Sequence, residues 1–235
     1  MSPSLTVVIP AYNEQDNLAQ AIDNVERALE GLIDDYEIIV VDDGSRDRTA
    51  VIAQERGKKD ARIQCLCNDR NRGCGYSYWR GVSLARKDYV SGFPADNEMS
   101  WGSLRDLVKH MGQTDIISSY MSNPQDRPWP RRVFSRMFVV LMNIVFNMRL
   151  RYFNGYFIGR RDLVQALTVR SSGLTILAEC KVRLIKKGCS YLEIPFVHTP
   201  RHCGASTALR FKSIKEVIAA VLCLHRDMYW RRKDR

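Results

Sequence analysis

The sequence has no apolar stretch long enough to cross a membrane as a helix. The uncharged segment MFVVLMNIVFNM, residues 137–148, has twelve residues, whereas a helix needs about 20 to span ~30 Å of hydrocarbon. The N-terminus shows no basic and apolar leader, and the seven cysteines are an odd number at scattered positions. These absences predict a chain that keeps its thiols reduced and works in the cytoplasm.

Two common nucleotide-binding signatures are also missing. No Walker sequence occurs, and GCGYSY at 73–78 lacks the third glycine of the dinucleotide fingerprint, which argues against a Rossmann dehydrogenase. The net charge of +10 and the pI near 9.4 point to anionic partners: nucleic acid, phosphorylated small molecules or an acidic membrane. Because no aromatic RNA-binding signature accompanies the charge, we expect no nucleic-acid partner.

Acidic residues are absent between Arg127 and Arg161, where arginine is frequent. Arginine presents a planar fork of donors that suits phosphate groups, so this segment has the composition of a phosphate-binding region. The eight arginines are Arg127, Arg131, Arg132, Arg136, Arg149, Arg151, Arg160 and Arg161.

Apolar runs rich in Val and Ile alternate with helical patterns along most of the chain. LTVVIPAYNE and YEIIVVDDGS, each followed by an amphipathic segment, are the first two examples, and strands are also expected near 61–68, 89–96 and 115–120. The pattern predicts one α/β domain with a parallel sheet covered on both faces. Ligands of such sheets bind beyond the carboxyl ends of the strands, where three acidic clusters fall: Glu14, Asp42 with Asp43, and Asp96 with Glu98.

Seven segments carry a family resemblance. VVIPAYNEQDNL, EIIVVDDGSRDRT, NRGCGYSYWRG, ADNE, GLTILAE, LEIPF and RHCGAS occur in the order seen in inverting GT-A glycosyltransferases of family 2, from about Leu5 to Leu209. The chain resembles most the polyprenyl-phosphate glycosyltransferases, the branch that includes dolichol-phosphate mannose synthase. The resemblance implies a Rossmann-like GT-A domain over residues 1–212, with an amphipathic interface helix near 133–150. Residues 213–235 are expected to form a basic amphipathic helix and tail.

The resemblance assigns the donor site to the first acidic clusters. Pro10, Tyr12 and Glu14 would line the base and ribose pocket of a nucleotide-sugar, with Asp42 and Asp43 meeting it from the second strand. The alternative is that Asn13 and Glu14 only cap the first helix.

The third acidic cluster lies in FPADNEMSWGS, residues 93–103. The family usually has Asp-Ala-Asp-x-Gln here, so Pro94 replaces the first Asp, Asp96 keeps the second and Glu98 occupies the Gln position. The resemblance implies that Asp96 and Glu98 are catalytic and bind Mg²⁺ or Mn²⁺, with Asp96 also facing the donor. The alternative is a solvated acidic turn capping the helix that begins near Ser100 or Ser103.

The remaining implied residues concern phosphate. Arg131 and Arg201 would be catalytic, with Arg201 and Ser206 closing over the donor, and Arg131, Arg149 and Arg151 holding the acceptor phosphate. The family has Lys after the serine, where this chain has Thr207. A hydroxyl acceptor needs a carboxylate base, and relatives with such acceptors commonly have Asp after Glu, whereas AECK places Cys180 after Glu179.

The resulting prediction is metal-dependent, inverting transfer of a sugar from a GDP- or UDP-sugar to polyprenyl phosphate, peripherally on the cytosolic membrane face. A membrane-anchoring partner protein is a further expected partner. Transfer to a saccharide or small-molecule hydroxyl, and a catalytically weak nucleotide- or lipid-binding protein, remain the alternatives. HTPRH pairs His198 with His202, but Pro200 between them favours a loop over a helical zinc site.

Overall fold

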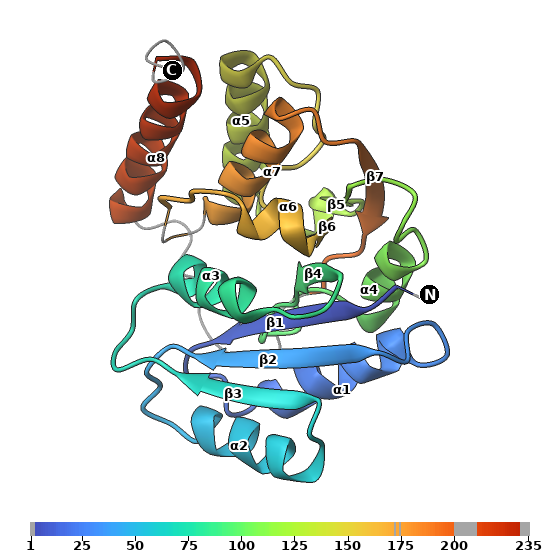
Figure 1. Ribbon diagram of the computed structural model, residues 1–235. Coiled ribbons are helices and arrows are strands. Elements are labelled where there is room, and N and C mark those ends of the chain that lie inside the picture. The colour runs from blue at the N-terminus through green and yellow to red at the C-terminus, as the bar shows by residue number, and fades with distance from the viewer. Residues whose placement is uncertain (1–2, 172, 174, 200–210, 231–235) are drawn as a thin grey trace.

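The computed structural model describes residues 3–171, 173, 175–199 and 211–230, with residues 211–216 described by their backbone alone. Seven strands form one sheet in the order β3-β2-β1-β4-β6-β5-β7 (Figure 1). The strands are β1 Leu5–Ala11, β2 Tyr36–Asp42, β3 Ile63–Cys67, β4 Tyr89–Gly92, β5 Ile116–Met121, β6 Phe157–Arg160 and β7 Tyr191–Phe196.

All strands of this sheet except β6 run in the same direction. β1 pairs in parallel with β2 and β4, β2 with β3, and β5 with β7, whereas β6 is antiparallel to both β4 and β5. Every residue of β1 and β2 is buried, as expected for strands covered on both faces. The predicted α/β domain with a mostly parallel sheet is thus confirmed.

Helices cover both faces of the sheet. On one face lie α1 Leu18–Leu29, α2 Thr49–Lys59 and α4 Trp101–Val108, and on the other lie α3 Cys74–Leu84, α6 Arg161–Gln165 and α7 Ile176–Lys186. Helix α1 shows why the sequence folds this way, because Leu18, Ile22, Val25 and Leu29 recur at helical spacing and are all buried. A short 3₁₀ turn, η1 Pro124–Asp126, follows β5.

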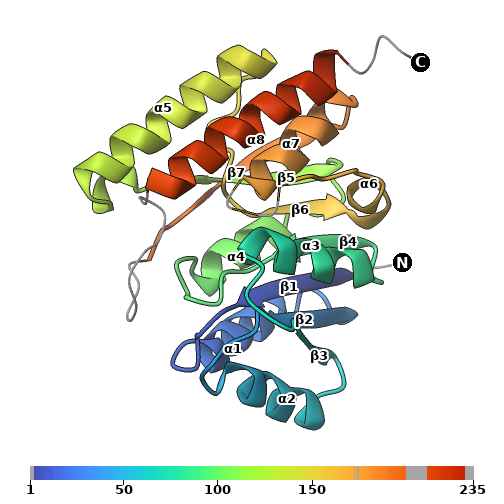
Figure 2. The same cartoon turned by 90° about the vertical axis from the view of Figure 1, so that its left-hand side faces the viewer.

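Two further helices form an outer layer over α7. Helices α5 Trp129–Phe146 and α8 Phe211–Tyr229 lie next to one another in both views (Figures 1 and 2). A separate apolar cluster joins the three helices, with Phe146 from α5, Val182 from α7 and Leu224 from α8 among its members. A helix therefore forms where the interface helix was predicted, and it packs on the domain along one side.

Helix α5 ends at Phe146 because Asn147 adopts the left-handed conformation, with φ of 46°. The sequence predicted one helix over the whole uncharged run, residues 137–148. The helix ends two residues before that run does. Among the described residues, none of the helices combines the length and apolar character needed to cross a membrane.

Candidate active site

The parallel direction of the strands brings the predicted site residues to one edge of the sheet. The segments after β1, β2 and β4 carry Glu14, Asp43 and Asp96, and all three leave the carboxyl ends of neighbouring strands. The segments after β5 and β7 emerge at the same edge. This edge is the place where open α/β sheets bind ligands.

The first two loops at this edge are bonded to each other. The backbone N–H of Asn13 donates to Ser45 Oγ at 2.9 Å, and the N–H of Arg46 donates to Asn13 Oδ1 at 2.9 Å. The N–H of Glu14 donates to Thr49 Oγ1 at 2.8 Å. Asn13 is left-handed, with φ of 53°, and the neighbouring Tyr12 ring is 40% exposed. The two predicted donor loops thus form one unit with an exposed aromatic ring beside it, while Pro10 is buried within β1.

The two acids after β2 have different surroundings. Asp43 is saturated, because its carboxylate accepts hydrogen bonds from Asn68 Nδ2 at 2.6 Å and from the N–H groups of Arg72 and Gly73 at 2.9 and 2.7 Å. Asp42 is also buried, yet its Oδ1 has no hydrogen-bond partner among the described residues. Asp43 thus anchors the loop after β3, whereas Asp42 is left with a buried carboxylate oxygen that the described residues do not satisfy.

The acidic loop lies between β4 and α4. Asp96 is 8% exposed, and its Oδ1 accepts a hydrogen bond from the N–H of Glu98 at 3.1 Å. Helix α4 is capped by Ser100, whose Oγ accepts from the N–H of Ser103 at 3.2 Å. The capping role that could have explained the acids is therefore filled by a serine.

Glu98 belongs to a charged cluster that local sequence patterns did not predict. Its Oε2 lies 3.7 Å from His198 Nε2 and 3.9 Å from Arg127 Nη2. His198 reaches this position because its backbone forms an antiparallel bridge with Met99. The predicted loop from His198 to His202 lies mostly outside the described residues, which end at Thr199 here, but the histidine at its start lies in the candidate site.

The surroundings of His198 favour the neutral form of its ring. Burial lowers its pKa, and the positive charges of Arg127 and Arg131 add to this effect, while Glu98 opposes it. Neither ring nitrogen has a hydrogen-bond partner among the described residues. The buried imidazole lies beside one carboxylate, that of Glu98, and both are groups that can bind a divalent cation.

The predicted phosphate-binding arginines are not all in one place. Arg131, in the first turns of α5, is close enough to influence His198. The Arg151 guanidinium lies over the Tyr120 ring, 4.6 Å from its centroid, near the carboxyl end of β5. Arg149 is exposed in the segment after α5. Arg201 and Ser206, like Thr207 and His202, lie outside the described residues.

The segment that supplies a base in hydroxyl-transferring relatives is engaged differently in this chain. Cys180 is fully buried, and burial raises the pKa of its thiol. The Glu179 carboxylate accepts hydrogen bonds from the N–H groups of Arg170 and Ser171 and from Arg183 Nε. Neither side chain is available to take a proton from an acceptor.

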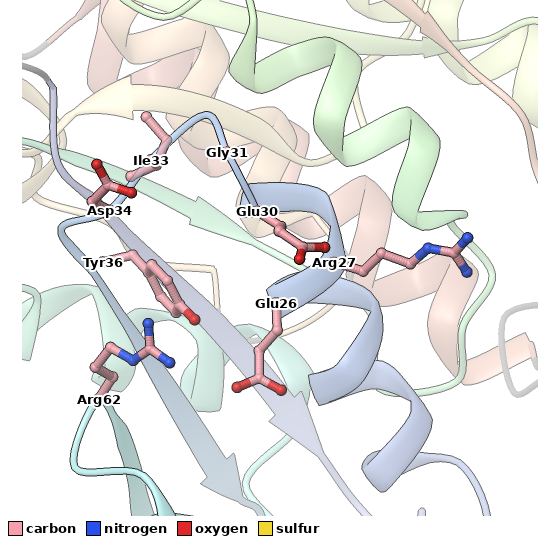
Figure 3. A pocket seen from close by; sticks show the side chains of 8 residues that line it. All are labelled: Glu26, Arg27, Glu30, Gly31, Ile33, Asp34, Tyr36 and Arg62. Atoms are coloured by element: carbon pink, nitrogen blue, oxygen red, sulfur yellow. The ribbon is translucent and has the colours of Figure 1, made fainter.

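A polar hollow of about 640 Å³ lies at the opposite end of the sheet, beside the amino ends of β2 and β3 (Figure 3). Figure 3 shows Arg62 against the Tyr36 ring, with Glu26 facing this pair from α1. Burial raises the pKa of Glu26 and of Tyr36. None of the predicted site residues lines this hollow, so it is distinct from the candidate site.

Two curated proteins are similar to this chain over nearly its full length. Dolichol-phosphate mannosyltransferase from Pyrococcus furiosus is 28% identical over 96% of this chain, which spans 64% of that protein, just under two thirds of its length. Undecaprenyl-phosphate 4-deoxy-4-formamido-L-arabinose transferase from Edwardsiella ictaluri is 29% identical, covering 94% of this chain and 67% of that protein.

The fold is shared with a solved enzyme structure. Glucosyl-3-phosphoglycerate synthase from Mycobacterium tuberculosis, in complex with Mn²⁺, uridine diphosphate and phosphoglyceric acid, superposes with a TM-score of 0.75 at 18% identity, covering 95% of this chain and 78% of that chain. The family model described as Glycosyl transferase family 2 matches residues 6–168. The resemblance inferred from the motifs is thereby confirmed, and the chain belongs to glycosyl transferase family 2.

Proposed function

We propose that this chain transfers a sugar from a GDP- or UDP-sugar to a polyprenyl phosphate at the surface of a membrane. The observation that carries the proposal is the position of α5. Its first turns supply Arg131 to the charged cluster around Glu98, and the rest of the helix exposes apolar side chains. One helix thus connects the candidate site to a surface that suits lipid. The names of two relatives, transferases of dolichol phosphate and undecaprenyl phosphate, support the same acceptor class.

A nucleotide-sugar would be held by the joined donor loops. The free Oδ1 of Asp42 is placed to accept a hydrogen bond from the base or ribose, and the exposed Tyr12 ring offers a stacking surface. Glu14 completes this part of the predicted pocket. The solved neighbour contains uridine diphosphate, which supports a nucleotide donor without deciding the base.

Asp96, Glu98 and His198 have the ligand chemistry for Mg²⁺ or Mn²⁺, being two hard carboxylates and a neutral imidazole. No group of three or more His, Cys, Asp or Glu side chains converges closely enough within the described residues to hold a metal unaided. The diphosphate of the donor and water would therefore supply the other ligands. When bound, such a cation supplies neutralisation of the charge that develops on the departing nucleoside diphosphate.

The acceptor phosphate is already an anion at neutral pH, so it needs cations for positioning and no base. Arg131 adds positive charge to the surroundings of His198, and Arg127 lies beside Glu98 with its Nε atom buried and without a hydrogen-bond partner among the described residues. We assign both to the phosphate groups, with Arg151 as a further contact. A phosphate oxygen then attacks the anomeric carbon while the bond to the diphosphate breaks. The engaged Glu179 and the buried Cys180 disfavour a hydroxyl acceptor.

The membrane part of the proposal concerns α5 and α8. The exposed apolar residues of this surface are Trp129, Val133, Phe134, Met137, Val140, Leu141, Ile144, Ile218 and Leu222. Arg132 and Arg136 lie on the same stretch of α5 and are exposed. Apolar side chains interleaved with arginines are typical of helices that lie in the headgroup region. A peripheral position on the cytosolic face, and a partner protein that anchors the chain there, remain predictions.

The deciding experiment offers several labelled donors and acceptors to the purified protein. GDP-mannose, UDP-glucose and UDP-N-acetylglucosamine are each incubated with polyprenyl phosphate in vesicles or with a soluble saccharide, with Mn²⁺ or a chelator. We expect metal-dependent transfer of label into the lipid fraction. Transfer to the saccharide would instead support a hydroxyl acceptor, and nucleotide binding without any transfer would support the catalytically weak alternative.

A further inference from the structure

Asn97 separates Asp96 from Glu98 and has an unusual backbone conformation. Its φ is 57°, in the left-handed region that asparagine enters more readily than other non-glycine residues. The N–H of Asn97 donates to the carbonyl oxygen of Pro94 at 3.3 Å, which closes a turn. The direction in which the loop presents its two carboxylates therefore depends on the conformation of this one residue.

The side chain of Asn97 is held by helix α1 through both ends of its amide. Its Oδ1 accepts a hydrogen bond from Asn24 Nδ2 at 2.9 Å, and its Nδ2 donates to the carbonyl oxygen of Asn17 at 3.1 Å. Both partners lie outside the acidic loop. The amide thus fixes the turn to a rigid element, which is what a side chain must do to hold a strained backbone in place.

One of these partners also touches the donor loop. Asn17 Nδ2 donates to Glu14 Oε2 at 2.8 Å, while the carbonyl oxygen of Asn17 accepts from Asn97. A continuous chain of hydrogen bonds therefore runs from Glu14, in the predicted nucleotide pocket, through Asn17 to the residue between the two predicted metal ligands. On its far side, the loop is fixed by the N–H of Thr199, which donates to the carbonyl oxygen of Glu98 at 3.0 Å.

We infer that Asn97 is a positioning residue that couples nucleotide binding to metal binding. It sets the direction of Asp96 and Glu98, and through Asn17 it makes that direction depend on the loop that holds the nucleotide. The inference rests on the proposed function, because it takes the two acids as ligands of the cation. Coupling of this kind is reciprocal, so each ligand must strengthen the other by the same factor.

The experiment measures Mn²⁺ affinity by calorimetry, with and without saturating GDP or UDP, and nucleotide affinity without metal. Asn97→Gly is the main variant, because glycine keeps the left-handed backbone and removes both side-chain bonds. Asn147→Gly is the matched control, since Asn147 is also left-handed but ends α5. Asn24→Ala removes one of the two hydrogen bonds to the Asn97 amide while leaving the sequence of the acidic loop unchanged.

We expect nucleotide to tighten Mn²⁺ binding about tenfold or more in the wild type and in Asn147→Gly. In Asn97→Gly, Mn²⁺ affinity without nucleotide should fall several-fold, and the tightening should be several-fold smaller than in the wild type, since only the direct contact of the diphosphate with the cation remains, while nucleotide affinity without metal stays within about twofold. In Asn24→Ala, the Mn²⁺ affinity and its tightening by nucleotide should lie between those of the wild type and those of Asn97→Gly.

Wild-type affinity and wild-type coupling in Asn97→Gly would overturn the inference and leave the proposed metal site standing. A wild type that binds nucleotide but no Mn²⁺ would overturn both the inference and the metal dependence of the proposed function. If Asn97→Gly does not fold, as judged by circular dichroism, Asn24→Ala decides, and unchanged coupling in it overturns the inference.

Discussion

The Nε2 atom of His198 lies 3.7 Å from Oε2 of Glu98, although the two residues follow different strands. Glu98 comes after β4 and His198 after β7, and the bridge between Met99 and His198 brings the segments together. The pair places a carboxylate oxygen and an imidazole nitrogen side by side at the edge of the sheet where the predicted donor loops lie. This arrangement makes the loop after β7 part of the candidate site.

Metal dependence is expected to rest on Asp96. Asp96→Asn should lower turnover by orders of magnitude, because it removes the charge that holds the cation near the departing diphosphate. Glu98→Gln should be tolerated, since glutamine keeps an oxygen ligand and is the residue that the family usually has at this position. Initial rates over a Mn²⁺ titration measure both effects. Full activity of Asp96→Asn in the presence of a chelator would contradict the assignment.

Nucleotide binding is expected to depend on Asp42 even without metal. Asp42→Ala should weaken binding of GDP or UDP about tenfold, the loss expected when a hydrogen bond to a buried, charged acceptor is removed. Asp43→Ala should act differently, lowering the thermal stability because its carboxylate holds the loop after β3. Calorimetry measures the nucleotide affinity, and thermal unfolding measures the stability, so the two effects can be separated. Equal nucleotide affinity in Asp42→Ala and wild type would move the base pocket elsewhere.

Membrane binding is expected to be reversible and stronger with anionic lipid. Each basic residue near an anionic surface contributes about 1 kcal/mol, and salt screens this attraction over about 10 Å at 0.1 M. In liposome flotation, Val140→Asp and Arg149→Glu should each reduce the bound fraction.

Val51→Asp is the control for Val140→Asp. Val51 is 42% exposed on α2, and Val140 is 50% exposed on α5, so the two changes differ mainly in their location. If the floating fraction responds to neither salt nor the changes at Val140 and Arg149, the proposed lipid-facing role of α5 is wrong.

The stability of the protein is expected to rise with pH between about 7 and 10. Lys181 is fully buried in α7, where burial lowers the pKa of its amine to about 7, against an opposing effect of Glu193. In the unfolded chain the pKa of lysine is about 10.4, so the unfolded state binds more protons across this interval. The free energy of unfolding then increases by up to about 1.4 kcal/mol per pH unit.

Lys181→Met should remove this contribution and raise the free energy of unfolding at pH 7. The exposed Lys187, changed to Met, is the control. Denaturant unfolding at pH 7 and pH 9 provides the comparison. An identical pH dependence in wild type and Lys181→Met would show that the amine does not carry the effect.

Local patterns were sufficient to predict the N-terminal part of the sheet, with its first strands and helices. β1 and β2 are continuous apolar runs, and α1 has its apolar residues at helical spacing, so strand, helix and strand follow from the sequence. The sequence also predicted that the acids at the ends of these strands lie close together, because the carboxyl ends of parallel strands lie at the same edge of the sheet. The antiparallel direction of β6 is not encoded in this way, since a four-residue strand can pair in either direction.

The remaining site residues depend on contacts between distant segments. His198 was interpreted as a loop residue from its neighbour Pro200, and the local sequence contains nothing that indicates its approach to Glu98. Arg127 is one of eight arginines in an acid-free segment, and composition does not rank them. The hydrogen bonds of Asn97 to α1 likewise become visible only when the helix and the loop are packed together.

The order of strands in the sheet also affects how the chain can acquire its structure during synthesis. Residues 5–92 contain β3, β2, β1 and β4, which are neighbours in the sheet and form its donor half. A ribosome releases these residues before α5, with its apolar exposed surface, is made. The core of this half also includes Leu104, Ile117 and Phe196, which are made later, so the half is completed only with the rest of the domain. The exposed apolar face of α5 is nevertheless made after these four strands, which shortens the time that it spends without them.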